Sequence, residues 1–258
     1  MAVRLSTALV NKMMDTACFK DLLSNCVIDI YTGSQPTSAD DAKSGTLLVS
    51  VTKNSGAHTS ETAAVGSLTI AGASGSVDTV TVNAVDILGG SVAFVTDINT
   101  TATAVATQIN KNPKNKNITA STTGSSGVIT LTARPGLGSL PNTWAVSGTY
   151  TTITGGTYVA MTGGVNAANG LNFGAAVLGV LSKDSDTWSG TAVATGTAGW
   201  FRVRGRGDDG TAADSSKVYP RFDGAISTSG AQMNLGSTTI TSGAPFIVPV
   251  AAFTLPTA

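Results

Sequence analysis

Residues 198–208 read AGWFRVRGRGD, and this stretch contains the clearest single strand of the sequence. Successive side chains of a strand point to opposite faces, so Phe201 and Val203 share one face. The other face carries the tryptophan and the arginines: Trp200, Arg202, Arg204 and Arg206. We expect the apolar face to cover a core and the second face to point out of the subunit.

The row of Trp200, Arg202, Arg204 and Arg206 is therefore the candidate protein-contact surface, because Trp and Arg dominate contact hot spots. The alternative is an exposed strand whose arginines only guard against edge pairing. In that case Arg221 and Asp223 on an adjacent strand could neutralise part of the row.

The composition predicts a β-rich protein that associates with other copies. Only 12% of the 258 residues are charged, about half of the usual ~25%. Lys+Arg and Asp+Glu both number 15, so the net charge is zero, which argues against binding to nucleic acid or to an anionic membrane. A neutral surface rich in Ser and Thr is poorly protected against self-association, so we expect a homo-oligomer.

The chain carries neither a disulfide framework nor an evident targeting segment. Cys18 and Cys26 are too few for such a framework and are expected to be free thiols. Polar residues interrupt the N-terminal sequence, so no signal peptide is expected. No run approaches the ~20 apolar residues of a membrane span. We expect synthesis in the cytoplasm.

The two ends of the chain share one pattern of short strands. Residues 5–17 have apolar side chains at helical spacing and predict a helix, and residues 26–32 alternate as a strand with one buried face. After residue 169 short strands and turns follow at regular intervals. This spacing predicts an antiparallel β-sandwich or jelly-roll-like domain formed by residues 1–56 and 170–258. Pro245, Pro249 and Pro256 predict that the last strand lies at an edge.

Residues 57–169 have a different texture, with few charges and their own order of strands, one helix and further strands. Ala102, Val105, Ala106 and Ile109 form one stripe of the helix expected at residues 99–110. The pattern predicts a small inserted α+β module, with its helix on one face of an antiparallel sheet. Gly56 and Gly170 flank it as flexible joints.

No constellation of residues in the sequence predicts catalysis, cofactor binding or a metal site. His58 is the only histidine and is expected in an exposed loop, and there is no GxSxG elbow, Walker loop or GxGxxG motif. Two Cys and one His do not make a zinc site. The remaining acidic clusters lack EF-hand spacing and are expected to be solvated turn residues: Asp184 with Asp186, and Asp208 and Asp209 near Asp214.

Several phrases of the sequence resemble small structural proteins of tailed bacteriophages. They are IYTGSQPTSADDAKSGTLLVSVT at residues 30–52, residues 170–205 from GLNFGAAVLG to GWFRVRG, and residues 223–256 from DGAISTSGAQ to AAFTLP. In those relatives the outer domain is uninterrupted, whereas here residues 57–169 separate its halves. The insert, from GSLTIAGASGSVDTVTVNAVDILG to GGTYVAMTGGV, also resembles a module that recurs in phage virion proteins.

The resemblance implies a virion component that contacts other virion proteins of the capsid or tail. Head or neck decoration through symmetric protein–protein contacts is the first interpretation, and a tail or baseplate accessory that attaches fibres is the second. A carbohydrate-binding module for host surface glycans is an alternative of another class, but glycan sites use aromatic platforms and the chain has only three tryptophans: Trp144, Trp188 and Trp200.

Overall fold

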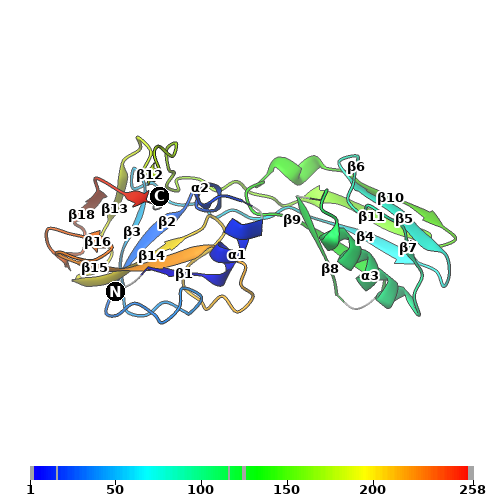
Figure 1. Cartoon of the computed structure of the whole chain (residues 1–258), viewed down its shortest axis with the longest axis horizontal. Helices are drawn as coiled ribbons and strands as arrows, with labels where there is room; N and C mark the ends of the chain where they lie inside the picture. Colours follow the sequence, from blue (N-terminus) through cyan, green and yellow to red (C-terminus); the bar gives the residue numbers. More distant parts are fainter. Residues whose placement is uncertain (1–2, 16, 116, 124–125, 255–258) are drawn as a thin grey trace. The chain divides into compact units, whose positions relative to one another are not determined.

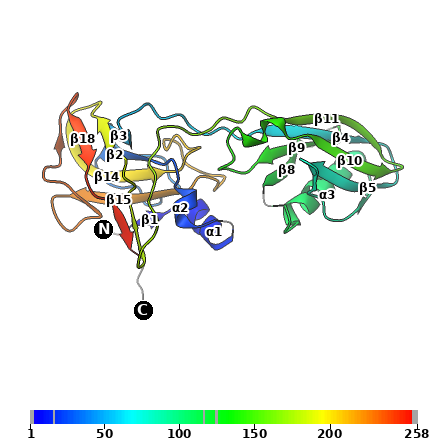
Figure 2. The ribbon, with the colours of Figure 1, turned by 90° about the horizontal axis from the view of Figure 1, so that it is seen from above.

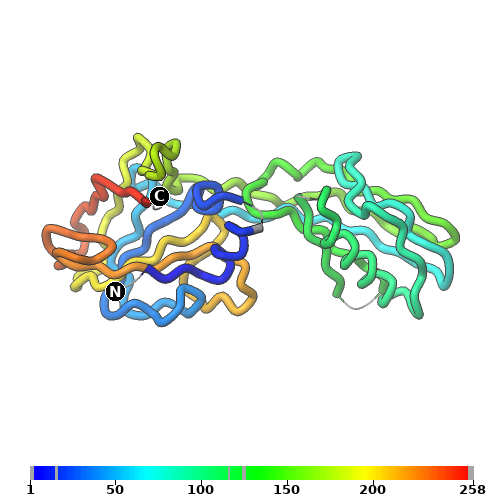
Figure 3. The backbone as a smooth tube through the Cα atoms, viewed as in Figure 1, coloured from blue at the N-terminus to red at the C-terminus, as the bar shows by residue number. Residues whose placement is uncertain are grey.

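The chain forms two compact units, Met1–Ser60 with Ala167–Ala258 (unit 1) and Glu61–Asn166 (unit 2). The computed structural model describes residues 3–15, 17–115, 117–123 and 126–254. The backbone leaves unit 1 after residue 60 and returns to it at residue 167 (Figure 3). Each unit has its own hydrophobic core, and no residue of one core belongs to the other unit.

A nine-stranded sheet is the framework of unit 1. Its main path runs in the order β1 (Arg4–Leu5), β15 (Arg221–Ser227), β14 (Gly196–Arg204), β2 (Val27–Thr32), β3 (Leu47–Lys53), β13 (Trp188–Thr191) and β18 (Pro245–Val248). β16 (Met233–Asn234) pairs with β15, and β17 (Thr239–Ile240) pairs with β14. All of these pairs are antiparallel except β15 with β16. β14, the strand expected in residues 198–208, lies between β15 and β2 in the middle of the sheet (Figure 1).

One face of this sheet packs on an aromatic core. Short elements cover it: α1 (Thr7–Asp15), α2 (Phe19–Leu22) and the two-stranded sheet of β12 (Val180–Ser182) with β19 (Ala252–Thr254). Phe253 of β19 meets Phe222 of the large sheet at 5.2 Å between ring centroids, and Phe173 meets Trp188 at 5.3 Å. Unit 1 is thus a mainly antiparallel β structure in which helices and a small sheet cover the large one.

Several expected elements of unit 1 are confirmed, with adjusted bounds. The helix expected at residues 5–17 spans Thr7–Asp15, and residue 16 lies outside the described residues. Pro245 begins β18, the strand that ends the main sheet path, and Pro249 follows it, as expected for an edge strand. The last described strand of the chain is a separate one, β19, which pairs with β12; Pro256 also lies outside the described residues. The prediction that residues 26–32 bury only one face is wrong, because five of the six residues of β2 are buried.

Unit 2 contains two four-stranded antiparallel sheets and one long helix (Figures 1 and 2). The first sheet is β11 (Thr154–Thr162), β4 (Val65–Ala71), β9 (Val128–Ala133) and β8 (Ile118–Thr122). The second is β10 (Val146–Thr151), β5 (Ser76–Val82) and β6 (Val85–Asp86), with β7 (Val92–Ala93) paired to β5.

The helix of unit 2, α3 (Ile98–Lys111), confirms the helix expected at residues 99–110. The Asp97 carboxylate caps its N-terminus by accepting from the backbone N–H of Asn99 at 2.8 Å and of Thr100 at 2.9 Å. The predicted apolar stripe is buried in the core: Ala102, Val105, Ala106 and Ile109. Amphipathic spacing was therefore sufficient to place this helix and its inner face.

A strained turn joins β5 to β6. Asn83 and Ala84 both have positive φ, at 51° and 61°, which is the backbone of a type I′ hairpin turn. Asn tolerates this left-handed conformation, but the Cβ of Ala does not fit it well. We expect Ala84→Gly to stabilise unit 2 by about 0.5–1 kcal/mol, after allowance for the greater freedom of glycine in the unfolded chain.

Thermal unfolding of the two proteins checks this expectation. Ala93→Gly is the matched control, because Ala93 is exposed in β7 and has no positive φ, so glycine there should lower the stability. Equal destabilisation by both substitutions would contradict the turn assignment.

Candidate functional site

The predicted contact row does not point out of the subunit. Trp200 and Arg202 are 0% exposed, and the Arg204 side chain is 11% exposed. Arg206 follows the end of β14, is half-buried, and donates to the backbone carbonyl of Asp21. The expectation of an outward Trp and Arg surface is wrong, because both faces of β14 are buried.

Arg202 lies in a row of polar residues that crosses the large sheet. In the strand register Arg202 stands opposite Asp29 of β2 on one side and Asp223 of β15 on the other. Ser50 of β3 continues the row beyond Asp29, and Arg4 of β1 continues it beyond Asp223. The Arg202 guanidinium binds Asp223 through two parallel bonds, Nε–Oδ1 and Nη2–Oδ2, each 2.8 Å long. Such a bidentate pair fixes orientation as well as charge.

Two further ion pairs complete this buried network. The Nε of Arg204 lies 2.7 Å from the Asp29 carboxylate, which also accepts from the Ser50 hydroxyl at 2.5 Å. Arg221 binds both carboxylate oxygens of Asp208. The prediction that Asp208 and Asp214 are solvated turn residues is wrong, because both are buried.

Two polar loops cover this face of the sheet, residues 33–46 and 205–220. Arg202 Nη1 donates to the backbone carbonyls of Asp41 at 3.0 Å and Gly210 at 3.1 Å, one from each loop. The loops also bond to one another, since the Lys43 N–H donates to the Thr211 carbonyl at 3.0 Å. The guanidinium therefore takes the place of water as the hydrogen-bond donor to these loop carbonyls. Without it, the carbonyls would be buried without partners.

The tryptophan of the row is part of the same packing. The Trp200 indole stacks on the Tyr31 ring with centroids 4.6 Å apart, and the Lys43 ammonium lies 5.6 Å from the Tyr31 ring centroid. Burial raises the pKa of the Asp223 carboxyl, and the Arg202 guanidinium opposes this shift. The network is thus a structural brace, and the geometry does not present it to a partner.

His58 lies in a hollow of unit 1 with Ser50, Thr52 and Arg204 among its lining residues. The prediction of an exposed loop histidine is wrong, since the residue is half-buried and both ring nitrogens are buried. Burial lowers the pKa of the imidazole, and the nearby Arg204 charge lowers it further. His58 is therefore neutral over a wider pH range than a free histidine.

This depressed pKa predicts a pH-dependent stability. The unfolded chain takes up a proton near the ordinary histidine pKa of about 6.5, while folded His58 does not. The stabilisation is therefore present above about pH 6.5 and is lost as the pH falls towards the folded pKa, with a slope of at most about 1.4 kcal/mol per pH unit. Urea unfolding between pH 5.5 and 7.5 should show this slope in the natural protein. His58→Gln should remove it, because the chain has no other histidine; an unchanged slope would contradict the assignment.

Helix α1 carries exposed apolar residues, and they lie outside the contact row that the sequence predicted. Val10, Met13 and Met14 occupy positions i, i+3 and i+4 of α1 and form one exposed stripe, with Met14 85% exposed. The opposite side of this helix, with Ala8 and Leu9, is buried. Periodicity could have found the stripe, but only the packing shows which apolar side of α1 faces solvent.

A turn of unit 1 carries the second exposed apolar group. Val177 and Val180 are bridged by backbone hydrogen bonds of 2.9 Å in both directions, and Leu178 lies between them with a φ of 48°. Leu178 is 91% exposed and Val177 is 64% exposed. Two adjacent apolar side chains on a tight, left-handed turn are candidates for insertion into a partner.

Among the described residues, no group of three or more His, Cys, Asp or Glu side chains is placed to hold a metal ion. The helices in the described part of the chain are all too short or too polar to cross a membrane. Comparison of the chain with family models, with curated proteins and with solved structures gives no match.

Proposed function

We propose that this protein is a structural component of a tailed-phage virion that decorates the surface of the head or neck through symmetric contacts between copies and with the capsid. Residues 30–52, 170–205 and 223–256 resemble small structural proteins of tailed bacteriophages, and this resemblance supports the virion assignment. The exposed apolar stripe of Val10, Met13 and Met14, together with the Leu178 turn, is the observation that supports contact with other proteins.

The proposed contact surface replaces the row of Trp200, Arg202, Arg204 and Arg206. Large apolar side chains at exposed positions gain free energy when a partner removes them from water, about 25 cal/mol per Å². Arg202 and Trp200 have already lost their solvent in the folded subunit. In this proposal the buried ionic network keeps the subunit rigid and the apolar groups make the contacts.

We also propose that unit 1 is a reduced sandwich. Its first layer is the nine-stranded sheet, and its second layer is the pair β12–β19 with α1 and α2. Such a layered domain presents loops and edges on its outside, where contacts with neighbouring copies can form.

The test combines particle composition with the oligomeric state. We expect the protein in purified virions, at the head or neck after immunogold labelling, and a discrete oligomer by light scattering of the isolated protein. Met14→Ser and Leu178→Ser should weaken association, whereas Ser227→Ala, a matched single-residue change in β15, should not. A strictly monomeric protein that is absent from virions contradicts the proposal, and labelling at the tail tip favours the baseplate or fibre-attachment alternative instead.

A further inference from the structure

Unit 2 contains a small pocket that has no part in the proposed contacts between copies. It has a volume of about 120 Å³, and its lining comes from three segments of the chain: the β5–β6 turn, the loop after α3, and Trp144. Pockets for drug-sized ligands usually measure about 300–1,000 Å³. This pocket is therefore suited to a single ring or to one residue of a longer chain.

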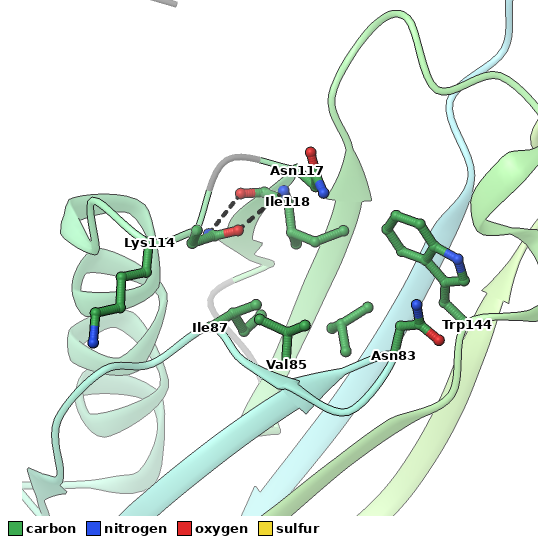
Figure 4. A pocket seen from close by; sticks show the side chains of 9 residues that line it. Asn83, Val85, Ile87, Lys114, Asn117, Ile118 and Trp144 are labelled. Atoms are coloured by element: carbon green, nitrogen blue, oxygen red, sulfur yellow. Dashed lines mark hydrogen bonds between the residues drawn. The ribbon is translucent and has the colours of Figure 1, made fainter.

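The lining of the pocket is apolar in the middle and polar at the rim. Val85, Ile87 and Ile118 lie between Trp144 at one end and Lys114 at the other, as Figure 4 shows. Asn83 lies beside the indole, and Asn117 lies at the rim next to Ile118. The hydrogen bonds of the described residues do not use the side-chain amides of these two asparagines, so both amides can meet a ligand.

Buried asparagines hold the walls of the pocket rigidly. The Asn115 amide nitrogen donates to the carbonyls of Ile109 at 3.0 Å and Ile118 at 2.8 Å, and its oxygen accepts from the Ile118 N–H at 3.1 Å. Asn112 donates to the Ile87 carbonyl at 2.9 Å. These bonds fasten Asn112 and Asn115 to the end of α3, to the first residue of β8 and to the backbone of Ile87, which follows β6. These walls of the pocket are therefore preorganised for a ligand.

Trp144 is the tryptophan that a ligand can reach. Trp188 and Trp200 are buried in unit 1, whereas Trp144 is half-buried at the pocket. Backbone bonds fix it on both sides, from its own N–H to the Pro141 carbonyl at 2.9 Å and from the Met161 N–H to its carbonyl at 3.0 Å. An indole held in this way offers a flat apolar surface at little cost in conformational entropy.

We propose that this pocket binds one neutral sugar residue of a glycan. A pyranose ring has an apolar C–H face that matches the indole and the aliphatic floor, and hydroxyl groups around its edge. Each amide of Asn83 and Asn117 supplies both a donor and an acceptor, which is what hydroxyl groups require. The ammonium of Lys114 lies at the opposite end of the pocket from the Trp144 indole. A sugar ring stacked on the indole is therefore not next to this charge and can be neutral.

The inference is independent of the virion assignment, and its test uses the full chain with the methyl glycosides of glucose, galactose, mannose and N-acetylglucosamine. We expect one of them to change the emission of Trp144 with a Kd of about 1 mM, the affinity appropriate to a ring of about a dozen non-hydrogen atoms. Trp144→Phe should abolish the emission change, because the two remaining tryptophans are buried in unit 1.

A second pair of variants separates binding from folding. Asn83→Gly removes one amide and still permits the positive φ of 51° at this position, and it should raise the Kd about tenfold by calorimetry. Tyr158→Thr removes an exposed aromatic ring of unit 2 outside the pocket and should leave the Kd unchanged. The proposal is overturned if none of the four glycosides binds at tens of millimolar, or if Tyr158→Thr weakens binding as much as Asn83→Gly does.

Discussion

Arg202→Met is expected to destabilise the protein by about 3–5 kcal/mol, because it leaves the Asp223 carboxylate buried without its bidentate partner. The substitution also removes the donors to the carbonyls of Asp41 and Gly210, which hold the covering loops. Urea unfolding followed by tryptophan emission measures the loss, with separate transitions fitted for the two units.

The pH dependence of this loss identifies its cause. Removing Arg202 takes away the hydrogen bonds and the charge that most strongly oppose the raised pKa of Asp223, while the more weakly acting charges of Arg221 and Arg4 remain. The pKa of Asp223 therefore rises further, and protonation relieves the buried charge. The loss of stability should therefore be smaller at pH 5 than at pH 8. A pH-independent loss would indicate that packing, and not the unpaired carboxylate, is responsible.

Two controls accompany Arg202→Met. Arg202→Met with Asp223→Leu should be more stable than the single variant, since it removes both charges together. Lys53→Met breaks the partly exposed pair of Lys53 with Asp186, which are 3.0 Å apart, and should cost at most about 1 kcal/mol. If the two single substitutions cost the same, the buried network is not the brace that we describe.

Excision of residues 61–166 is expected to leave unit 1 folded. Thr59 and Ala168 exchange backbone hydrogen bonds of 3.1 Å in both directions, so the two ends of the cut already lie side by side. A Gly-Gly linker between Ser60 and Ala167 makes a four-residue hairpin loop, which costs little entropy to close. The core of unit 1 loses no residue in this excision.

The excised piece, residues 61–166, is expected to fold as well. Thr62 and Val165 near its two ends are bonded to one another at 3.1 Å and 2.9 Å, and its core is complete. Circular dichroism and thermal unfolding should show one cooperative transition for each piece. The same piece with Val105→Asp, which places a charge in the core, is the unfolded control. A non-cooperative melt of either piece would contradict the independence of the two units.

Much of the local structure could be predicted from the sequence, because local patterns determine it. The alternation in residues 198–208 and the apolar stripe of Ala102, Val105, Ala106 and Ile109 are set by the strand and helix periods. The prolines at 245 and 249 likewise restrict their strand to an edge, since proline supplies no N–H to a ladder. The mainly antiparallel β character of the fold follows from these patterns.

The orientation of the contact surface was decided only by the tertiary structure. Alternation states that Trp200, Arg202 and Arg204 share a face, but it does not state what covers that face. Polar loops cover it. Their backbone carbonyls and the carboxylates of Asp223 and Asp208 supply the hydrogen bonds and charges that the arginines would otherwise find in water. Those carboxylates are distant in sequence or lie in turns, so strand register and long-range packing bring them to the arginines. The sequence by itself thus determined which side chains lie together, and only the assembled sheet and its loops decided whether they face a partner or the interior.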